Sequence, residues 1–187
     1  MRKVERGDLE ILLRLLNSNW YGKHTWSLSN PDDQEWWFEV ITKDPTTVMF
    51  LVFDVTKKLA VGVYKLGCID LINRSAQSSH DVFVDKQGNG YGYLLKEAGV
   101  DFAFEMFGLY RLDTEVLENN LASQKTIERA GFTQEGVRSE AVFRCGERLD
   151  SLTYGLTLPN WKRLSRVKKY EGCCNISYQP KNKQKTN

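Results

Sequence analysis

Three glycines between residues 87 and 92 offer the clearest candidate for chemistry in this sequence. The run Gln87-Gly88-Asn89-Gly90-Tyr91-Gly92 lies between the short β-favouring segment 82–84 and a long segment with helical spacing of apolar residues. The first N–H groups of a helix lack internal partners and lie at the positive end of the helix dipole. Glycines let an anion approach these groups, because they have no Cβ atom and accept positive φ. The run therefore predicts a phosphate site at a helix N-terminus.

Two widespread phosphate loops do not fit this run. No Gly-Lys-Ser/Thr follows it to reach terminal phosphates and hold magnesium, and the glycine spacing is not G-x-G-x-x-G. What remains is Q-x-x-G-x-G before a helix, which resembles the pyrophosphate-binding signature of the GNAT superfamily of N-acetyltransferases. Members of that superfamily bind acetyl-coenzyme A. An ordinary glycine- and asparagine-rich turn between a strand and a helix would look similar, so this motif alone leaves both readings open.

A second motif supports the same family. Segment 119–132 reads NNLASQKTIERAGF and follows a β-favouring run at 111–117. It resembles the N-x-x-S…E-[KR]-x-G-F signature of the RimJ/RimL-like branch of the GNAT superfamily. The resemblance continues through 135–150, reaches back to 61–76, and covers most of the chain up to about Trp161. It implies an enzyme that transfers the acetyl group of acetyl-coenzyme A to a primary amine.

The resemblance also implies roles for particular residues. The main chain of Val82, Phe83 and Val84 would pair with the pantetheine arm, and one N–H there would polarise the thioester carbonyl. The pyrophosphate would be held by Gln87, Gly88, Asn89, Gly90, Tyr91 and Gly92. Asn120, Ser123 and Lys125 would contact the cofactor from the second motif, although capping of the following helix is an equally physical role for Asn120.

Proton transfer is where the sequence departs from the commonest family pattern. The reaction needs a neutral amine, stabilisation of the oxyanion and a proton for the leaving thiolate. Many relatives carry a tyrosine four residues before the Gly-Phe pair, but Ile127 stands there and cannot donate a proton. The branch resemblance assigns the donor role to Ser123, acting directly or through a water molecule. The alternative is an ordinary serine in the first turn of a helix.

The general base is a choice among several groups. Relatives often place a glutamate on the fourth strand, but residues 76–79 read AQSS. The nearest titratable groups are His80 and Asp81, which we predict as catalytic candidates, although a lone histidine on a strand is more often structural. Glu115 is a further candidate whose alternative role is a surface salt bridge. A water relay would also serve.

The pattern of apolar residues predicts the elements that position these groups. We expect a helix capped by Asp8, and a second helix after Pro31 whose stripe of Trp36, Trp37, Val40 and Ile41 packs on the sheet. Further helices follow the glycine run and span 119–130. Strands are expected at 48–55, 59–71, up to 84, at 109–116, 132–142 and 147–157, with hairpin turns at 56–58 and 145–146.

These elements predict an α/β protein of the mixed α+β type. A central mixed, mostly antiparallel sheet of about six to seven strands would be flanked by helices. The family resemblance implies the GNAT fold, in which strands four and five are splayed apart to admit the pantetheine arm.

Length and composition predict one soluble, cytoplasmic domain. At 187 residues the chain can bury a substantial core, and no apolar run approaches the roughly 20 residues that span a bilayer. Its N-terminal residues lack the apolar core of a secretion signal. The four cysteines, Cys68, Cys145, Cys173 and Cys174, lack metal-ligand spacing, so free thiols and no metal are expected.

Charged residues are unevenly distributed along the chain. From Pro159 onward, eight basic residues face one acidic residue, a net charge of +7, and the remainder carries −5. We expect an acetyltransferase domain at 1–161, whose acidic surface suits a cationic amine, and a basic polar extension at 162–187 that is partly disordered or docked. Attachment of this extension to nucleic acid or the ribosome is the less favoured reading. Trp20, Tyr21 and Trp26 could form a homodimer face or a wall of the acceptor site.

The acceptor amine is the least determined feature. The branch resemblance puts a protein N-terminal amine first, and an amino sugar, a polyamine or another small amine is the alternative. A coenzyme A-binding regulator that has lost catalysis is a second alternative, which the missing tyrosine permits. Nothing in the sequence chooses among these acceptors.

Overall fold

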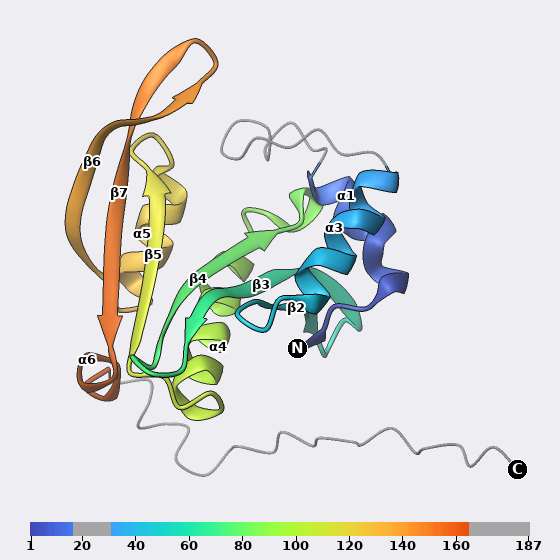
Figure 1. Ribbon diagram of the computed structural model, residues 1–187, viewed down its shortest axis with the longest axis horizontal. Helices are drawn as coiled ribbons and strands as arrows, with labels where there is room; N and C mark the ends of the chain where they lie inside the picture. Colours follow the sequence, from blue (N-terminus) through green and yellow to red (C-terminus); the bar gives the residue numbers. More distant parts are fainter. Residues whose placement is uncertain (17–30, 165–187) are drawn as a thin grey trace, which may run out of the picture.

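A seven-stranded sheet organises the protein, and helices cover both of its faces (Figure 1). The structure is a computed structural model that describes residues 1–16 and 31–164. Its helices are α1 (Leu9–Leu16), α3 (Pro31–Lys43), α4 (Tyr91–Glu105), α5 (Leu121–Arg129) and α6 (Leu158–Lys162). Its strands are β1 (Arg2–Lys3), β2 (Val48–Asp54), β3 (Leu59–Asp70), β4 (Ser75–Val82), β5 (Arg111–Leu117), β6 (Thr133–Arg144) and β7 (Glu147–Thr157).

The strand order is β1-β2-β3-β4-β5-β7-β6. Strands β4 and β5 run parallel, and the other neighbouring pairs in the described chain run antiparallel. The predicted mixed, mostly antiparallel sheet is therefore confirmed. The predicted hairpin turn at 145–146 is also confirmed, because Cys145 and Gly146 adopt φ of 50° and 88°, as a two-residue turn between twisted strands requires.

Two apolar layers lie on the two faces of the sheet. On one face, Tyr64 and Leu66 of β3 pack against Leu95 and Val100 of α4. On the other face, Val63 of β3 packs with residues of α1 and α3, which are Leu12, Leu15 and Phe38. Alternate residues of a strand point to opposite faces, so each residue of β3 and β4 can be assigned to the α4 face or to the α1/α3 face.

A glycine brings α4 close to the sheet. A Cβ atom at Gly99 would lie 2.2 Å from the ring of Tyr64, which is fully buried. Any side chain at position 99 would therefore push the helix away from β3. The close approach fixes the position of α4, and hence that of its N-terminus, against the sheet.

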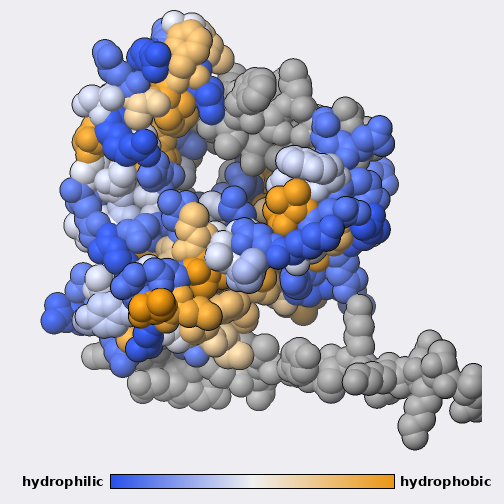
Figure 2. Space-filling model, viewed as in Figure 1, coloured by the Kyte–Doolittle hydropathy of each residue, from blue (hydrophilic) through white to orange (hydrophobic). Residues whose placement is uncertain are grey.

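Strands β4 and β5 separate after a short paired segment. Their register joins Ser75 to Arg111, Ala76 to Leu112 and Gln77 to Asp113, and pairing ends there. Beyond Gln77 the two strands diverge as the arms of a V, with β3 and β2 continuing one arm and β7 and β6 the other (Figure 1). A hollow lies between these arms in the space-filling view (Figure 2). The predicted splay between strands four and five is confirmed.

A buried lysine sits where the arms part. Lys96 of α4 donates from Nζ to the carbonyl oxygen of Ser78, at 3.0 Å, and to its Oγ, at 2.8 Å. The Ser78 Oγ also shares a hydrogen bond with the hydroxyl of Tyr64, at 2.9 Å. Ser78 is the first residue of β4 beyond the pairing with β5. Lys96 therefore donates a hydrogen bond to a main-chain oxygen that has no partner on β5.

No carboxylate in the described chain offsets the cost of burying the charge of Lys96. The side chain is fully buried, its Nζ lies 4.6 Å from the centroid of the Phe132 ring, and within residues 1–16 and 31–164 no carboxylate pairs with it. Burial lowers the pKa of Lys96 to about 7. Both the charged and the uncharged amine are therefore populated near neutral pH.

The low pKa predicts how stability varies with pH. Between about pH 7 and the ordinary lysine value of 10.5, the unfolded chain binds a proton at Lys96 that the folded chain releases. The free energy of unfolding therefore gains a contribution that rises with pH in this interval, by up to about 1.4 kcal/mol per pH unit. In Lys96→Met this contribution disappears. Urea denaturation at pH 7, 8 and 9 measures it, with Lys162→Met as an exposed control, and equal slopes for Lys96→Met and the unsubstituted protein would contradict it.

Candidate active site

The glycine run forms an open loop between β4 and α4. A short 3-10 turn at Val84–Lys86 follows the strand, and Gly88 and Gly90 then adopt φ of 75° and 80°. Gly90 is the N-cap of α4, it offers no side-chain hydrogen bond to the helix, and the first turn contains no acidic residue. The first N–H groups of α4 are thus left without a capping side chain, which is the geometry that an anion needs at a helix N-terminus.

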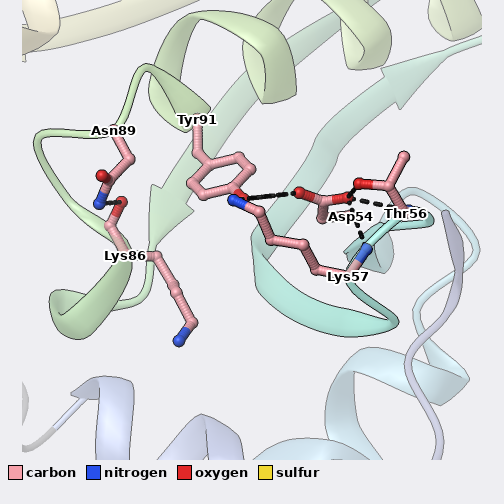
Figure 3. Close-up of polar contacts among 6 residues, drawn as sticks. All are labelled: Asp54, Thr56, Lys57, Lys86, Asn89 and Tyr91. Atoms are coloured by element: carbon pink, nitrogen blue, oxygen red, sulfur yellow. Dashed lines mark hydrogen bonds and ion pairs between the residues drawn. The ribbon is translucent and has the colours of Figure 1, made fainter.

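The polar side chains of the loop bind the loop itself. Gln87 donates from Nε2 to the carbonyl oxygen of Val82, at 3.3 Å. Asn89 donates from Nδ2 to the carbonyl oxygen of Lys86, at 3.3 Å (Figure 3). It also donates to the carbonyl oxygen of Gln87, at 3.0 Å. These contacts stabilise the loop backbone in an open shape. The structure thus gives Gln87 and Asn89 a supporting position and leaves the main-chain N–H groups free to meet an anion.

Gly92 lies between the two arms of the sheet. A Cβ atom there would lie 3.7 Å from Cγ2 of Val82, on the β4 arm, and 3.8 Å from Oγ1 of Thr126, in α5 beside the β5 arm. The backbone of Gly92 is not in the positive-φ region. A larger residue would therefore fit the backbone but would narrow the passage from the glycine loop into the gap.

The main chain of residues 82–84 divides into three different environments. The N–H of Phe83 donates to Val61 of β3, at 3.0 Å, and its side chain is only 6% exposed in the apolar layer under α1 and α3. Because main-chain groups alternate along a strand, those of Val82 point away from β3 and into the gap. Val84 lies beyond β4 in the 3-10 turn. Of the three predicted residues, Val82 thus has the orientation suited to a ligand between the arms, and Phe83 does not.

His80 and Asp81 lie on opposite faces of β4. His80 pairs in register with Tyr64 and shares the α4 face with Lys96, whereas Asp81 pairs with Val63 and shares the α1/α3 face. The two predicted catalytic candidates are therefore not brought together. Their neighbourhoods, moreover, shift their pKa values in opposite directions.

Burial, with a smaller effect of the Lys96 charge, lowers the pKa of His80 to about 3. Its imidazole is neutral at physiological pH and binds protons too weakly to take one from an ammonium group. Burial raises the pKa of Asp81 to about 6, against a smaller opposing effect of Lys65. Asp81 thus has the pKa suited to a base near neutral pH.

Glu115 of β5 is engaged elsewhere. Its carboxylate accepts from Arg138, at 3.1 Å, and from the hydroxyl of Ser151, at 3.1 Å. These bonds join β5 to β6 and β7. The structure therefore gives Glu115 the surface salt bridge that was its alternative role.

The second motif forms the start of α5. The Asn120 side chain caps this helix by accepting from the Ser123 N–H through Oδ1, at 3.2 Å. The Ser123 hydroxyl is partly exposed, and the described chain provides no hydrogen bond to it. Lys125 is exposed without an ion pair among the described residues, and Ile127 is 1% exposed in the core. The hydroxyl of Ser123 is thus free to bind a ligand.

Two features of this region were not found from the sequence. Lys96 falls among apolar residues of α4, and its neighbour Leu95 packs in the core, but only the three-dimensional packing shows that its amine is buried. The contact between Tyr91 and the β2–β3 turn joins residues 37 positions apart and leaves no local signal. Both depend on tertiary contacts.

The remaining expectations concern residues outside the described ranges, the cysteines, a metal site and a membrane span. Trp20, Tyr21 and Trp26, and the basic residues after Leu164, lie outside the described chain. Cys68 and Cys145 are exposed free thiols. Within residues 1–16 and 31–164, the His, Cys, Asp and Glu side chains form no group that could hold a metal ion. No helix in those ranges is both long and apolar enough to cross a membrane.

Comparison with known proteins places this geometry in a family. The family model for the acetyltransferase (GNAT) domain matches residues 1–133. The spermidine N(1)-acetyltransferase of Vibrio cholerae is 28% identical over 155 residues, which cover 80% of this chain and 87% of the relative. YdaF of Bacillus subtilis, provisionally named a ribosomal N-acetyltransferase, is 24% identical over 169 residues, which cover 87% of this chain and 92% of the relative.

A solved structure shares the fold. The spermidine N-acetyltransferase of Vibrio cholerae, in complex with CoA and spermine, superimposes with a TM-score of 0.81 and 24% sequence identity. The superposition covers 86% of this chain and 96% of that one. With the family model spanning well over half of the sequence, the chain belongs to the GNAT family and is an N-acetyltransferase that uses acetyl-coenzyme A.

Proposed function

We propose that this enzyme acetylates a primary amine of a small polyamine. One observation carries the proposal: the match to a spermidine acetyltransferase extends over 80% of this chain and 87% of that relative, at 28% identity. Protein N-terminal amines are the acceptors that the branch resemblance puts first, and polyamines are among the alternatives. The comparisons favour the alternative, and membership of the RimJ/RimL-like branch stays a prediction.

The diphosphate of acetyl-coenzyme A binds at the N-terminus of α4. Gly88, Gly90 and Gly92 leave its first N–H groups accessible, and no side chain or acidic residue competes there. The pantetheine arm then runs into the gap between the arms of the sheet, where the N–H of Val82 faces it. That N–H donates to the thioester carbonyl and stabilises the oxyanion as it forms.

Asp81 takes the proton from the attacking amine. It lies one residue from Val82 and faces the α1/α3 side, away from α4. Its raised pKa of about 6 leaves it ionised at neutral pH, yet basic enough to accept a proton. The amine nitrogen attacks the carbonyl carbon, the C–S bond breaks as the tetrahedral species collapses, and the thiolate leaves.

The departing thiolate takes its proton at the N-terminus of α5. The Ser123 hydroxyl is partly exposed there, and the helix dipole favours a negative sulfur near the same N-terminus. Ser123 therefore donates a proton to the thiolate or orients a water molecule that does so. Asn120 holds the first turn of α5 in place for this step.

Protein N-terminal amines are the second candidate acceptors. The match to YdaF, whose provisional name points to a ribosomal acceptor, covers 87% of this chain at 24% identity and supports a protein acceptor. A polyamine carries its amines on a flexible, strongly cationic chain, whereas a protein N-terminus carries one amine on a larger body. Turnover on representatives of the two classes separates them.

The acceptor is tested directly with the full chain and acetyl-coenzyme A. Thiol release is measured with spermidine, spermine, glucosamine and peptides that have free or blocked N-termini, and mass spectrometry identifies the product. We expect kcat/KM for a polyamine to exceed that for the peptides by at least tenfold, a difference of about 1.4 kcal/mol in transition-state binding. Faster turnover of free N-termini would favour the second candidate. Coenzyme A binding without turnover of any amine would favour a regulator.

Substitution of Gly92 tests the diphosphate site. Gly92→Ala meets only ordinary contacts at 3.7 and 3.8 Å and replaces glycine in a helix, so we expect stability to be unchanged or to rise by up to about 1 kcal/mol. The added methyl group narrows the path of the anion and raises the Kd for coenzyme A. Thermal unfolding and calorimetry measure the two effects, and Gly7→Ala, which meets no neighbour within 4 Å, is the control. Unchanged affinity in Gly92→Ala would place the diphosphate elsewhere.

The pH dependence of kcat/KM tests the general base. A polyamine nitrogen with a pKa near 10 must lose its proton, so log kcat/KM rises by about one per pH unit below that value. Below its pKa of about 6, Asp81 also becomes protonated and inactive as a base. The slope of log kcat/KM against pH therefore steepens to about two in that range.

We expect Asp81→Asn to lose this steeper limb and His80→Gln to keep it. The rate of Asp81→Asn at neutral pH falls by roughly a hundredfold or more, as for loss of a positioned base. Rates measured from pH 5 to 9 at subsaturating amine give both slopes. A steep limb that persists in Asp81→Asn would exclude this carboxylate as the base.

A further inference from the structure

A chain of three side chains ties the β2–β3 turn to the first turn of α4. Tyr91, the first residue of α4, donates from its hydroxyl to Oδ2 of Asp54, at 2.6 Å, and Asp54 is the last residue of β2 (Figure 3). Lys57, in the turn, donates from Nζ to the same hydroxyl, at 2.9 Å. Its ammonium also lies 3.8 Å from Oδ2 of Asp54 and 5.4 Å from the centroid of the Tyr91 ring.

The direction of these hydrogen bonds is fixed by Asp54. Its other carboxylate oxygen accepts from the hydroxyl and the N–H of Thr56, at 2.6 and 3.0 Å, and from the N–H of Lys57, at 3.1 Å. The bonds from Thr56, followed by the bond from Tyr91, hold the pKa of Asp54 well below its usual range. Asp54 is therefore ionised at working pH, so the Tyr91 hydroxyl points its hydrogen at Asp54 and presents its lone pairs to Lys57.

The ammonium of Lys57 is thus held in place with donors to spare. A lysine ammonium has three N–H groups, and one of them goes to Tyr91. The side chain is 63% exposed, so the other donors are accessible to a ligand. Accepting this bond, Tyr91 raises the pKa of Lys57 above its ordinary value and keeps it charged. The Lys86 side chain points away from Tyr91 and Lys57 in Figure 3 and is paired with Asp85 at 2.6 Å.

The location of this ammonium matters because Tyr91 is part of the glycine loop–helix junction. The residue before it, Gly90, is the N-cap of α4, and the first turn carries no acidic side chain. A cation held by the Tyr91 hydroxyl is therefore linked, through one side chain, to the first residue of this helix. Both features attract the same kind of ligand, an anion with several oxygens.

We propose that Lys57 is a phosphate-binding residue of the coenzyme A site, oriented by Tyr91 and Asp54. This inference rests on the proposed binding of the diphosphate at the first turn of α4. The β2–β3 turn then forms a second wall of the phosphate site, opposite the glycine loop. Coenzyme A carries phosphate in two places, the diphosphate and the 3′-phosphate of its ribose, and Lys57 binds one of them by a charge-assisted hydrogen bond.

The orienting chain has an energetic consequence. A free lysine side chain loses rotamer freedom when it binds a phosphate, whereas a lysine already held by Tyr91 has lost part of it on folding. Removal of the tyrosine hydroxyl should thus weaken binding through Lys57 alone. Asp54 and Tyr91 act as positioning residues, and Lys57 makes the contact.

Calorimetry of the full chain with coenzyme A and with 3′-dephospho-coenzyme A tests the proposal. We expect Lys57→Met to raise the Kd for coenzyme A roughly tenfold, as for loss of one charge-assisted hydrogen bond. The matched control is Lys58→Met, which removes a neighbouring exposed lysine of the same turn that forms no hydrogen bond or ion pair with the described residues. An effect of Lys57→Met on both ligands assigns the contact to the diphosphate, and an effect on coenzyme A alone assigns it to the 3′-phosphate.

A double-substitution cycle distinguishes positioning from a general structural role. Tyr91→Phe weakens binding when Lys57 is present, and we expect it to add little in the Lys57→Met background. A purely structural effect of the tyrosine would be the same in both backgrounds and would also appear in thermal unfolding.

Three results would overturn the inference: equal affinities for Lys57→Met and the unsubstituted protein, equal losses in Lys57→Met and Lys58→Met, or additive effects of Lys57→Met and Tyr91→Phe. Failure of the underlying diphosphate placement is recognised separately, because Gly92→Ala would then retain full affinity whatever Lys57 does.

Discussion

The loss of pairing between β4 and β5 is the constraint on which the rest of the structure depends. A strand that leaves its neighbour exposes main-chain N–H and C=O groups, and buried groups of this kind require partners. The protein supplies two of them with side chains: Lys96 donates to the oxygen of Ser78, and Gln87 donates to the oxygen of Val82. Both side chains donate to carbonyl oxygens, so neither provides an acceptor for a main-chain N–H group. The N–H of Val82 is left to face the gap, and a carbonyl group of a bound ligand is its natural partner.

The pleat of β4 then decides which groups can share in the reaction. Neighbouring residues point to opposite faces, so His80 meets α4 and Lys96 while Asp81 faces α1 and α3. Burial disfavours charge on either side, but it acts with opposite sign on an imidazole and a carboxyl group. The same physical effect therefore removes His80 from proton transfer and brings the pKa of Asp81 toward neutrality.

Local pattern predicted the fold well and the side-chain environments poorly. The strands, the turn at Cys145–Gly146 and the glycine loop follow from spacing and turn chemistry, which are local, and the splay followed from the family resemblance. The stripe predicted on α3 was wrong in part, since Trp36 and Val40 are 69% and 45% exposed while Phe38 packs in the core. Asp8 likewise closes the 3-10 turn before α1, where it accepts from Glu5, and does not cap α1 itself. Each error concerns the direction of a side chain, which depends on packing partners far away in the sequence.

The difference between local pattern and distant packing also explains why the sequence identified the family but not the acceptor. Both recognised motifs lie at helix N-termini that border the gap, where the loop before α4 and the capped start of α5 are built from main chain, glycine and short polar residues. Such geometry requires particular residue types at particular spacings, so it leaves a signature. The proposed acceptor site, in contrast, lies toward the face covered by α1 and α3, where apolar residues such as Leu12, Leu15 and Phe38 satisfy ordinary packing and many combinations serve equally well. Asp81 is the one predicted catalytic group on that face. A carboxylate there constrains how the amine loses its proton, but it says little about the shape of the amine. With Asp81 as the proposed base, selection among amines comes from the surface around it, which the two motifs do not specify.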